Sequence, residues 1–586
     1  MHISRILHQS LLNFSLKVAA YSISLVSTSV IFPNVVSAQS TPPPGVNIPP
    51  TTPETLDQTI PKPTPSPTPP PISPSPSSPI LPSPATPTPS DTTFPSDERF
   101  LVKKVEVLGA TVLKDKIGEL IKPFENRQVT FAGLIQLRSD ITELYIKNGY
   151  VTSGAFLPNN QNLTDGVVQI QVVEGELEKI ELAGLRRLQP GYVRSRLKKA
   201  ASTPLNQKRL EEALQVLQLD PLIQRVNAQL TAGSTPGSNI LQVEITEAPA
   251  FHAGVFTANN QSPSVGSTQA GVFLAHDNLL GFGDRLTAEY GITEGLNLYN
   301  VSYAIPINAN NGTLGFRVDN NDSRIIEDAF RDLDIRSETQ TYYLSYRQPI
   351  YRKPQTEFAL GLALDLRRSQ TYLLDDIPFS FSEGPKNGES KVTVIRFFQD
   401  WVKRDATKVL AARSQFSLGI GAFDATVNDI GTDGRFFSWL GQFQWVQRLS
   451  SRTILLARLN AQLTGDSLLS LEKFSIGGVD TVRGYPQNQI VSDNAITGSV
   501  EVRIPLISNS NALQIAPFFD IGTAWNNRGS NPQPQTISSF GLGLLWQPIR
   551  DLNLRLDYGI PLIDIDNRGN TLQDNGIHFS LQYQPL

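Results

Sequence analysis

The segment ITGSVEVRI, residues 496–504, decides the fold class of more than half of the chain. Apolar residues and one glycine occupy positions 496, 498, 500, 502 and 504, and polar residues occupy the four positions between them. A strict period of two places the polar side chains on one face of an extended strand and the apolar side chains on the other. Residues 453–463, apart from Leu456, and residues 437–445 follow the same rule. The pattern predicts long β-strands with one polar face and one apolar face.

Segments of this kind recur from about residue 251 to the end of the chain, where helical spacing is absent. We predict sixteen strands, at 251–259, 269–276, 284–290, 297–306, 313–319, 337–346, 356–367, 391–399, 408–417, 438–449, 453–464, 495–505, 512–524, 538–547, 552–560 and 575–583. An even number of strands, about 21 residues for each strand with its connection, and aromatic residues toward the segment ends favour a membrane barrel over a soluble sandwich.

The connections between these strands alternate in length. Tight turns at 450–452 and 548–551 contrast with long connections near 320–336, 368–390, 418–437 and 465–494. Short connections at one rim and long ones at the other are typical of an outer-membrane barrel. This alternation places both ends of the barrel in the periplasm.

Composition excludes several classes of protein. The chain has 586 residues, with 50 Lys and Arg against 54 Asp and Glu, and the net charge of −4 argues against a nucleic-acid-binding protein. No cysteine is present, so disulfides and cysteine-bound metals are excluded. The five histidines are scattered singly, without the spacing of metal ligands. A histidine-dependent hydrolase or a zinc enzyme is therefore not expected, and we assign no metal, cofactor or catalytic residue.

The N-terminal part of the chain reads as processing and linker sequence. Residues 1–38 combine a basic start, a short apolar run and the sequence Val36-Ser37-Ala38, which is typical of a cleaved signal peptide. Residues 39–98 are rich in proline, serine and threonine and predict a disordered, extended linker. Because proline opposes helix formation, we expect no plug helix from this region and a lumen closed by an external loop alone.

Two small α/β modules are expected between the linker and the barrel, over residues 99–175 and 176–249. In the first, the pattern predicts a strand at 101–108, helices at 114–122 and 134–148, and strands at 155–157 and 167–173. The second repeats the order, with a strand at 177–182, helices at 192–200 and from Asn206 to about 217, and strands at 223–230 and 239–246.

One group of residues in the first module resembles the POTRA domain of two-partner secretion transporters. The residues that carry this resemblance are Gly149, Tyr150, Pro158, Asp165, Gly166, Glu174 and Gly175. POTRA domains are periplasmic modules that receive unfolded polypeptides. A three-stranded sheet fits this role, because its exposed edge accepts an extended strand through main-chain hydrogen bonds.

Two motifs in the barrel extend the resemblance to residues 100–586. Val482, Arg483, Gly484 and Tyr485 resemble the signature of the sixth external loop in the POTRA-plus-barrel superfamily of BamA and TpsB, and they fall between the predicted strands eleven and twelve. The residues Phe518, Asp520 and Gly522 fit the Phe-x-Asp-x-Gly pattern of strand thirteen. The chain is thus similar to the ShlB/FhaC/HecB transporters of haemolysin secretion and activation.

The resemblance implies a function in the outer membrane of a diderm bacterium, with the POTRA domains in the periplasm. It implies a pore for two-partner, or type V, secretion that binds an unfolded TpsA-like exoprotein. Such a pore requires no catalytic residue and no enzyme activity. Outer-membrane lipid and, during biogenesis, the barrel-assembly machinery are the other expected partners, and nucleic acid is not one. Two alternatives stay open: a BamA- or TamA-like insertase and a passive solute channel.

The sharpest expectation joins the two barrel motifs. Alternation turns Phe518, Asp520 and Gly522 toward the lumen, since a carboxylate facing lipid is costly. The resemblance implies that the sixth loop folds back into the barrel, where Arg483 could bind Asp520 through its planar fork. We expect that removal of either side chain impairs secretion and that exchanging the two charges restores part of it.

Overall fold

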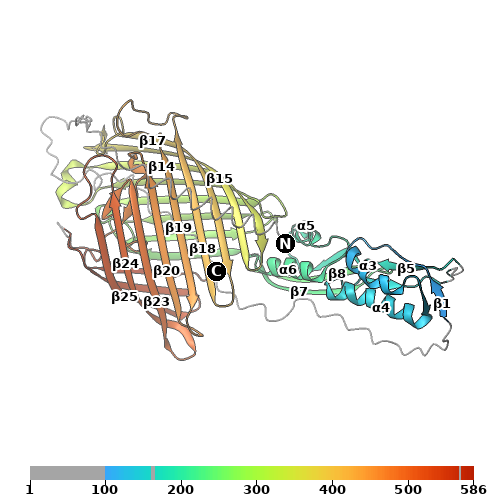
Figure 1. Cartoon of the computed structure of the whole chain (residues 1–586). Coiled ribbons are helices and arrows are strands. Elements are labelled where there is room, and N and C mark those ends of the chain that lie inside the picture. The colour runs from blue at the N-terminus through green and yellow to red at the C-terminus, as the bar shows by residue number, and fades with distance from the viewer. Residues whose placement is uncertain (1–98, 160, 162–164, 566–568) are drawn as a thin grey trace. The chain divides into compact units, whose positions relative to one another are not determined.

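The computed structural model describes residues 99–159, 161, 165–565 and 569–586, and it contains two α/β modules and a barrel (Figure 1). The expected signal peptide and proline-rich linker lie outside the described residues. Within these ranges, no helix is both long enough and apolar enough to cross a membrane.

The first module contains one three-stranded and one two-stranded sheet. Its elements are β1 (Arg99–Val102), β2 (Lys104–Leu108), α3 (Lys114–Ile121), β3 (Arg127–Thr130), α4 (Phe131–Lys147), β4 (Gly154–Phe156) and β5 (Val167–Val173). Strand β5 lies between β2, which is parallel to it, and β4, which is antiparallel. Leu137, Ile141 and Tyr145 of α4 are buried because they share one helical face. Strand β4 forms one edge of the sheet.

The single strand expected at 101–108 is two strands. Backbone amides of Lys103 and Lys104 both donate to Gly166 O, at 2.8 and 3.2 Å, and the chain changes partner at this point. Strand β1 therefore pairs with β3, while β2 pairs with β5. Strand β3 was not predicted, because its four residues carry one apolar side chain and show no alternation.

The second module has the expected order of elements. It comprises β6 (Glu176–Ala183), α5 (Pro190–Lys198), α6 (Gln207–Gln218), β7 (Ile223–Ala232) and β8 (Ser238–Glu247), with β8 at the centre of the sheet. The side chain of Asn206 caps α6 by accepting from the amides of Lys208 and Arg209, at 3.1 and 3.3 Å. Leu210, Leu214 and Leu217 then face the sheet.

The barrel closes on itself through sixteen long antiparallel strands within the described residues. They are β9 (Phe251–Ala258), β10 (Gln269–Asp277), β11 (Arg285–Ile292), β12 (Leu296–Pro306), β13 (Thr313–Arg324), β14 (Arg336–Lys353), β15 (Thr356–Leu373), β17 (Glu389–Arg404), β18 (Lys408–Ile420), β19 (Phe437–Arg448), β20 (Ile454–Thr464), β23 (Asn494–Ile507), β24 (Ser510–Trp525), β25 (Thr536–Ile549), β26 (Leu552–Pro561) and β27 (Ile577–Tyr583). A two-residue strand, β16 (Ile377–Pro378), pairs with β15.

Several strands run further than the alternation indicates. Strands β14 and β15 have 18 residues each, which is about 60 Å of extended chain, well beyond the apolar band of an outer membrane. Part of the expected long connections at 320–336 and 368–390 is therefore strand. The sequence pattern misses these ends because polar residues outside the membrane still pair in the ladder, as Arg336 does with Tyr372.

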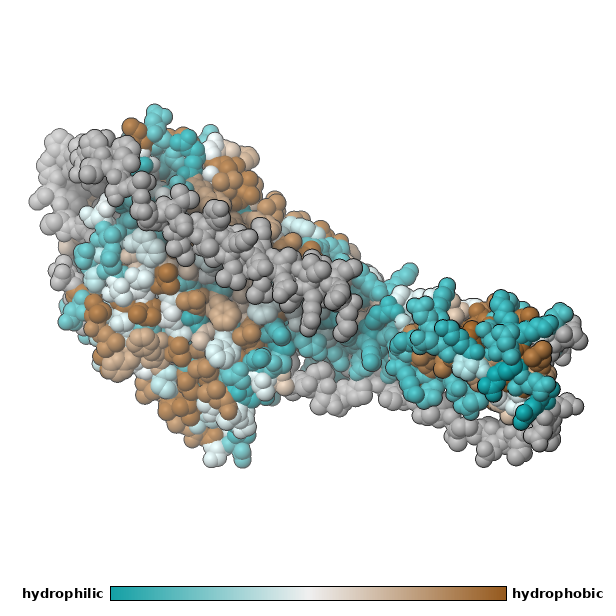
Figure 2. Space-filling view, viewed as in Figure 1, coloured by the Kyte–Doolittle hydropathy of each residue, from teal (hydrophilic) through white to brown (hydrophobic). Residues whose placement is uncertain are grey.

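The two faces of the barrel strands differ as the alternation predicts. In β24, Phe519 and Ile521 are exposed on the outer surface, while Phe518 and Asp520 are buried inside. Figure 2 shows hydrophobic side chains gathered over the side of the barrel and hydrophilic side chains over the α/β modules. An apolar outer band with a polar interior is the arrangement that a lipid bilayer requires.

Candidate functional site: a loop bound to the inner wall of the barrel

Loop 6, residues 465–493 between β20 and β23, is buried over most of its length. Its strands β21 (Phe474–Ile476) and β22 (Ile490–Ser492) pair with each other and form a hairpin. Ile476 and Val482 pack with Ala524 and Ile537, which belong to the barrel strands β24 and β25. Loop 6 thus folds against the inner wall, which is why its side chains are shielded from solvent.

The side chain of Arg483 makes the central contact of loop 6 with the wall. Its Nε and Nη2 atoms donate to the two carboxylate oxygens of Asp520, at 2.8 and 3.0 Å, and its backbone amide donates to the same carboxylate at 3.1 Å. Only 1% of Arg483 is exposed. The fork geometry gives both direction and strength to this charge-assisted contact. The structure therefore brings the two residues together.

Asp520 shares Arg483 with other carboxylates. Arg483 Nη1 lies 2.6 Å from Glu501 Oε2 and 3.4 Å from Asp557 Oδ1. Arg555 bridges the same two carboxylates, with 2.6 Å from Nη2 to Glu501 and 2.6 Å from Nε to Asp557. Alternating signs keep each buried charge next to an opposite one, which offsets the cost of removing these groups from water.

Phe518 and Gly522 of β24 shape the site that Arg483 and Val482 occupy. The guanidinium carbon lies 3.5 Å from the centre of the Phe518 ring, which is a cation–π contact. A side chain added at Gly522 would come within 3.0 Å of the Val482 side chain. Gly522 therefore leaves the space that Val482 fills.

Gly484 and Tyr485 complete the contact. Gly484 has φ +90°, in the left-handed region that favours glycine, and its amide donates to Nε2 of His578 at 3.0 Å. The hydroxyl of Tyr485 is 2.8 Å from Ile563 O and 3.0 Å from Ser538 O, and it accepts from the Ile563 amide at 3.1 Å. The four motif residues thus contact the wall as one continuous unit.

Sequence reasoning missed three wall residues around Arg483 and Gly484. No motif marks Arg555 and Asp557, which lie two positions apart in β26, or His578 in β27. Glu501 belongs to the alternating segment 496–504, and its polar position already predicted a lumen-facing side chain. Alternation applied to β26 and β27 could have identified the others as lumen-facing residues, although not as partners of Arg483.

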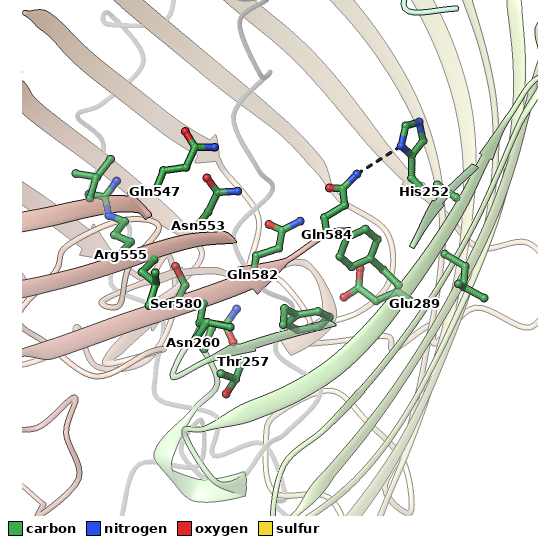
Figure 3. A pocket seen from close by; sticks show the side chains of 18 of the residues that line it. His252, Thr257, Asn260, Glu289, Gln547, Asn553, Arg555, Ser580, Gln582 and Gln584 are labelled. Atoms are coloured by element: carbon green, nitrogen blue, oxygen red, sulfur yellow. Dashed lines mark hydrogen bonds between the residues drawn. The ribbon is translucent and has the colours of Figure 1, made fainter. Parts of the chain in front are cut away.

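A polar cavity of about 870 Å³ lies inside the barrel beside strands β9 to β11 and β24 to β27. Amide side chains project into it, among them Gln547, Asn553, Gln582 and Gln584 (Figure 3). Arg555 also lines it, so the cavity adjoins the ion-pair cluster of loop 6. Uncharged amides can donate to and accept from polypeptide main chain without selecting a sequence.

The POTRA-like residues occupy turns and one buried corner of the first module. Gly149 has φ +88° and follows α4, while Gly166 has φ +73° and follows the exposed Asp165. Tyr150 packs its ring edgewise on Tyr145, with ring centres 5.9 Å apart. The carbonyl of Pro158 accepts from Gln161 Nε2 at 3.3 Å, and Gly175 has no room for a side chain beside Thr152.

Glu174 fastens the beginning of α3 to the end of β5. Its carboxylate accepts from the amides of Thr111 and Val112, at 2.7 and 3.2 Å, from the Thr111 hydroxyl, and from the Tyr145 hydroxyl at 2.8 Å. Burial by itself would raise the pKa of the carboxyl, but these donors outweigh burial and hold the pKa of Glu174 below its ordinary value.

Comparison with known protein families identifies the family of the chain. The profile described as "Haemolysin secretion/activation protein ShlB/FhaC/HecB" matches residues 237–545, and the profile "POTRA domain, ShlB-type" matches residues 100–175. The chain belongs to the ShlB/FhaC/HecB family. Members of this family are two-partner secretion transporters of the outer membrane whose POTRA domains lie in the periplasm.

Individual members of the ShlB/FhaC/HecB family are distant in sequence. The outer membrane transporter CdiB of Escherichia coli strain 536 is 24% identical over 421 residues, 67% of either chain. The heme/hemopexin transporter protein HuxB of Haemophilus influenzae is 24% identical over 440 residues, 72% of this chain and 76% of its own. The solved structure of CdiB from Escherichia coli superposes with a TM-score of 0.64 at 21% identity, over 86% of this chain and 94% of that one, and shows the same fold.

Proposed function

We propose that the chain is an outer-membrane pore that secretes one TpsA-like exoprotein, and that loop 6 is its reversible plug. One observation carries the proposal: loop 6 is joined to the inner wall by hydrogen-bonded ion pairs, chiefly Arg483 with Asp520. Such contacts can be released and remade without unfolding the barrel, because none of the sixteen strands has to leave its ladder. A pore that stays closed until a client arrives needs a plug of this kind.

The client enters, in this account, through the α/β modules. We assign residues 99–175 and 176–249 to two POTRA domains and residues 250–586 to the barrel. Strand β4 is an edge of its sheet, and Phe156 on it is exposed. An unfolded polypeptide can add to this edge as a further strand. Gly149, Gly166 and Glu174 support the turns that hold the edge in place, and we assign them no direct contact with the client.

Translocation then needs no chemical step by the protein. The client passes from the POTRA domains into the polar lumen, where the amide side chains of the 870 Å³ cavity offer hydrogen bonds to any sequence. Folding of the client outside the cell supplies the direction of movement. The chain acts as a transporter and not as an enzyme, with lipid around the barrel and the barrel-assembly machinery as its partner during biogenesis.

Deletion of the gene tests this function. The secreted proteins and the outer-membrane proteins of the deletion strain are compared with those of the parent by quantitative mass spectrometry. The proposal predicts loss of one large exoprotein from the medium and an unchanged set of outer-membrane barrels. Unchanged secretion would contradict the proposal.

An insertase is the second candidate, and one observation favours it. Strands β27 and β9 pair over four residue pairs, whereas β9 pairs with β10 over eight and β26 with β27 over seven. A short ladder is the least costly place to open the wall toward lipid. Against this, the side chain of Asn259 extends the seam, donating to Ile577 O at 2.8 Å and accepting from the Phe579 amide at 2.6 Å. A general loss of outer-membrane barrels in the deletion strain would identify an insertase.

A further inference from the structure

A second ion-pair cluster joins loop 6 to a different part of the wall. Glu472, at the end of a short 3₁₀ turn (Ser470–Glu472), accepts from Arg396 Nη2 of β17 at 2.8 and 3.0 Å. Arg367 Nη1 of β15 lies 3.3 Å from the same carboxylate and donates to Leu471 O at 2.6 Å. Asp365 of β15 accepts from Arg396 at 2.9 Å and completes the cluster.

These strands are remote from those that hold Arg483. Going around the barrel from β17, strands β18, β19 and β20 come before β23, the first strand that contacts Arg483. Loop 6 therefore carries two contacts, eleven positions apart in the sequence, that reach separate sectors of the wall. The segment between them follows the inner wall, where Phe474 and Ile476 are buried with Leu440 of β19 and Ala495 of β23.

Apolar packing supports the second contact. Leu468, Leu469 and Leu471 are buried against Val392 and Val394 of β17. An external loop surrounded by water would not bury three leucines within four residues. The packing shows that the segment before β21 is fitted to β17 and is not an open external connection.

Loop 6 contributes a negative charge to one cluster and a positive charge to the other. At β15 and β17 the wall contributes two arginines and one carboxylate, and the loop contributes the carboxylate of Glu472. At β23 to β26 the wall contributes the three carboxylates that bind Arg483, and the loop contributes the arginine. When the loop leaves, buried charges of each wall cluster lose a partner of opposite sign. Release of the loop therefore costs free energy at either end.

We propose that Glu472 is a second anchor of loop 6, which together with Arg483 holds the loop against the inner wall, so that both must release before a client passes. Passage of a client rests on the proposed secretion function, whereas the anchor is a property of the resting loop and is tested without a client.

Cysteine labelling provides the test. The chain has no cysteine, and Ser475 lies between the two anchors, fully buried and with a hydroxyl that finds no hydrogen-bond partner among the described residues. Ser475→Cys therefore introduces a single, nearly isosteric thiol. Full-length barrels in intact outer membranes are exposed to a membrane-impermeant maleimide, and only the heat-modifiable, folded protein is scored.

Removal of the anchor by Glu472→Ala should raise the labelling rate of Cys at 475 by about tenfold or more, since a buried ion pair that loses one partner is strongly destabilised. Glu472→Asp, which keeps the charge, should restore most of the protection of position 475 from labelling. The matched control is Glu389→Ala on β17, because Glu389 is half exposed, is paired with Lys391 at 2.6 Å and has no ion pair with loop 6 in the described part of the chain. An unchanged labelling rate in Glu472→Ala, or the same rise in Glu389→Ala, overturns the proposal. Loss of secretion plays no part in the readout, so failure of the proposed function would leave this result intact.

Discussion

Three N–H groups of Arg483 converge on the single carboxylate of Asp520, two from the guanidinium and one from the backbone. The contact therefore fixes the side chain and the main chain of loop 6 at once. A lysine cannot reproduce it, because an ammonium is a point charge without a planar fork. The same guanidinium also reaches Glu501 and Asp557, so one residue neutralises much of the wall's negative charge.

Replacement of Arg483 should release loop 6 while the barrel stays folded. Arg483→Ala leaves three buried carboxylates short of a partner, a loss of about 3–5 kcal/mol for the docked loop. We expect Ala to impair secretion, because a loop that cannot remake its contact with the wall no longer works as a reversible plug, and we expect Lys to retain part of it. The exoprotein in the medium is measured, with heat-modifiability as the check on folding. Arg550→Ala, in an exposed turn, is the control that should secrete normally. Normal secretion by Arg483→Ala would remove the role assigned to this residue.

Exchanging the charges of Arg483 and Asp520 should fail to restore secretion, although these two residues considered alone suggest that it would. The sequence predicts partial recovery in Arg483→Asp with Asp520→Arg, because it shows only two opposite charges. In the structure an aspartate at 483 would face Glu501 and Asp557, so the repulsion among carboxylates is made worse. We expect the double variant to secrete no better than Arg483→Asp alone, in the same assay. Recovery beyond the single variant would show that the other two carboxylates do not contribute.

Alternation explains why so much of the barrel could be predicted and why its ends could not. Alternation of polar and apolar residues depends on lipid on one side of the strand and water on the other. It therefore identified strands such as β19 and β20 to within a residue or two. It gives no signal where both faces meet water, as at Arg336 and Tyr372. Strand β3 was missed for the related reason that one buried residue, Val129, makes no pattern.

The sequence predicted the Arg483–Asp520 pair but not the network of ion pairs and hydrogen bonds around it. A motif marks Arg483 and another marks Asp520, and their facing directions follow from alternation. Arg396, Asp557 and His578 come together with loop 6 only because the barrel closes and brings distant strands to one place. No spacing in the sequence records that closure, since 74 residues separate Arg483 from Asp557.

Close backbone contact between Gly484 and Gly559 should be essential for docking of loop 6. A Cβ at Gly559 of β26 would lie 2.6 Å from Gly484 N and 2.7 Å from its Cα, closer than any side chain can approach. Gly559→Ala should therefore displace the loop and raise the conductance of single channels in planar bilayers. Gly465→Ala, in the same loop but with open space around its Cβ, is the matched control and should leave the conductance unchanged. Equal conductance of the two variants would argue against this contact.

Acid should loosen the first module through Glu174. The folded-state pKa of Glu174 lies below its ordinary value of 4.5, so the carboxylate stabilises the folded module above that pH. The contribution is lost as the pH falls through the folded-state pKa. Limited proteolysis of the full-length protein in detergent at a series of pH values measures this. We expect Glu174→Gln to be cut faster than wild type at pH 7 and to lose the part of the acid dependence that Glu174 causes. Identical pH profiles of the two proteins would contradict the assignment.

The central claim is that a client passes through the lumen, and site-specific photo-cross-linking during secretion tests it most directly. One cross-linker replaces Asn553 of β26, which projects into the cavity, and the matched one replaces Leu556 of the same strand, which is exposed on the outer surface. The account predicts cross-links from position 553 to one secreted protein and none from position 556. Cross-links from position 556 to many barrel precursors, with none from position 553, would contradict it.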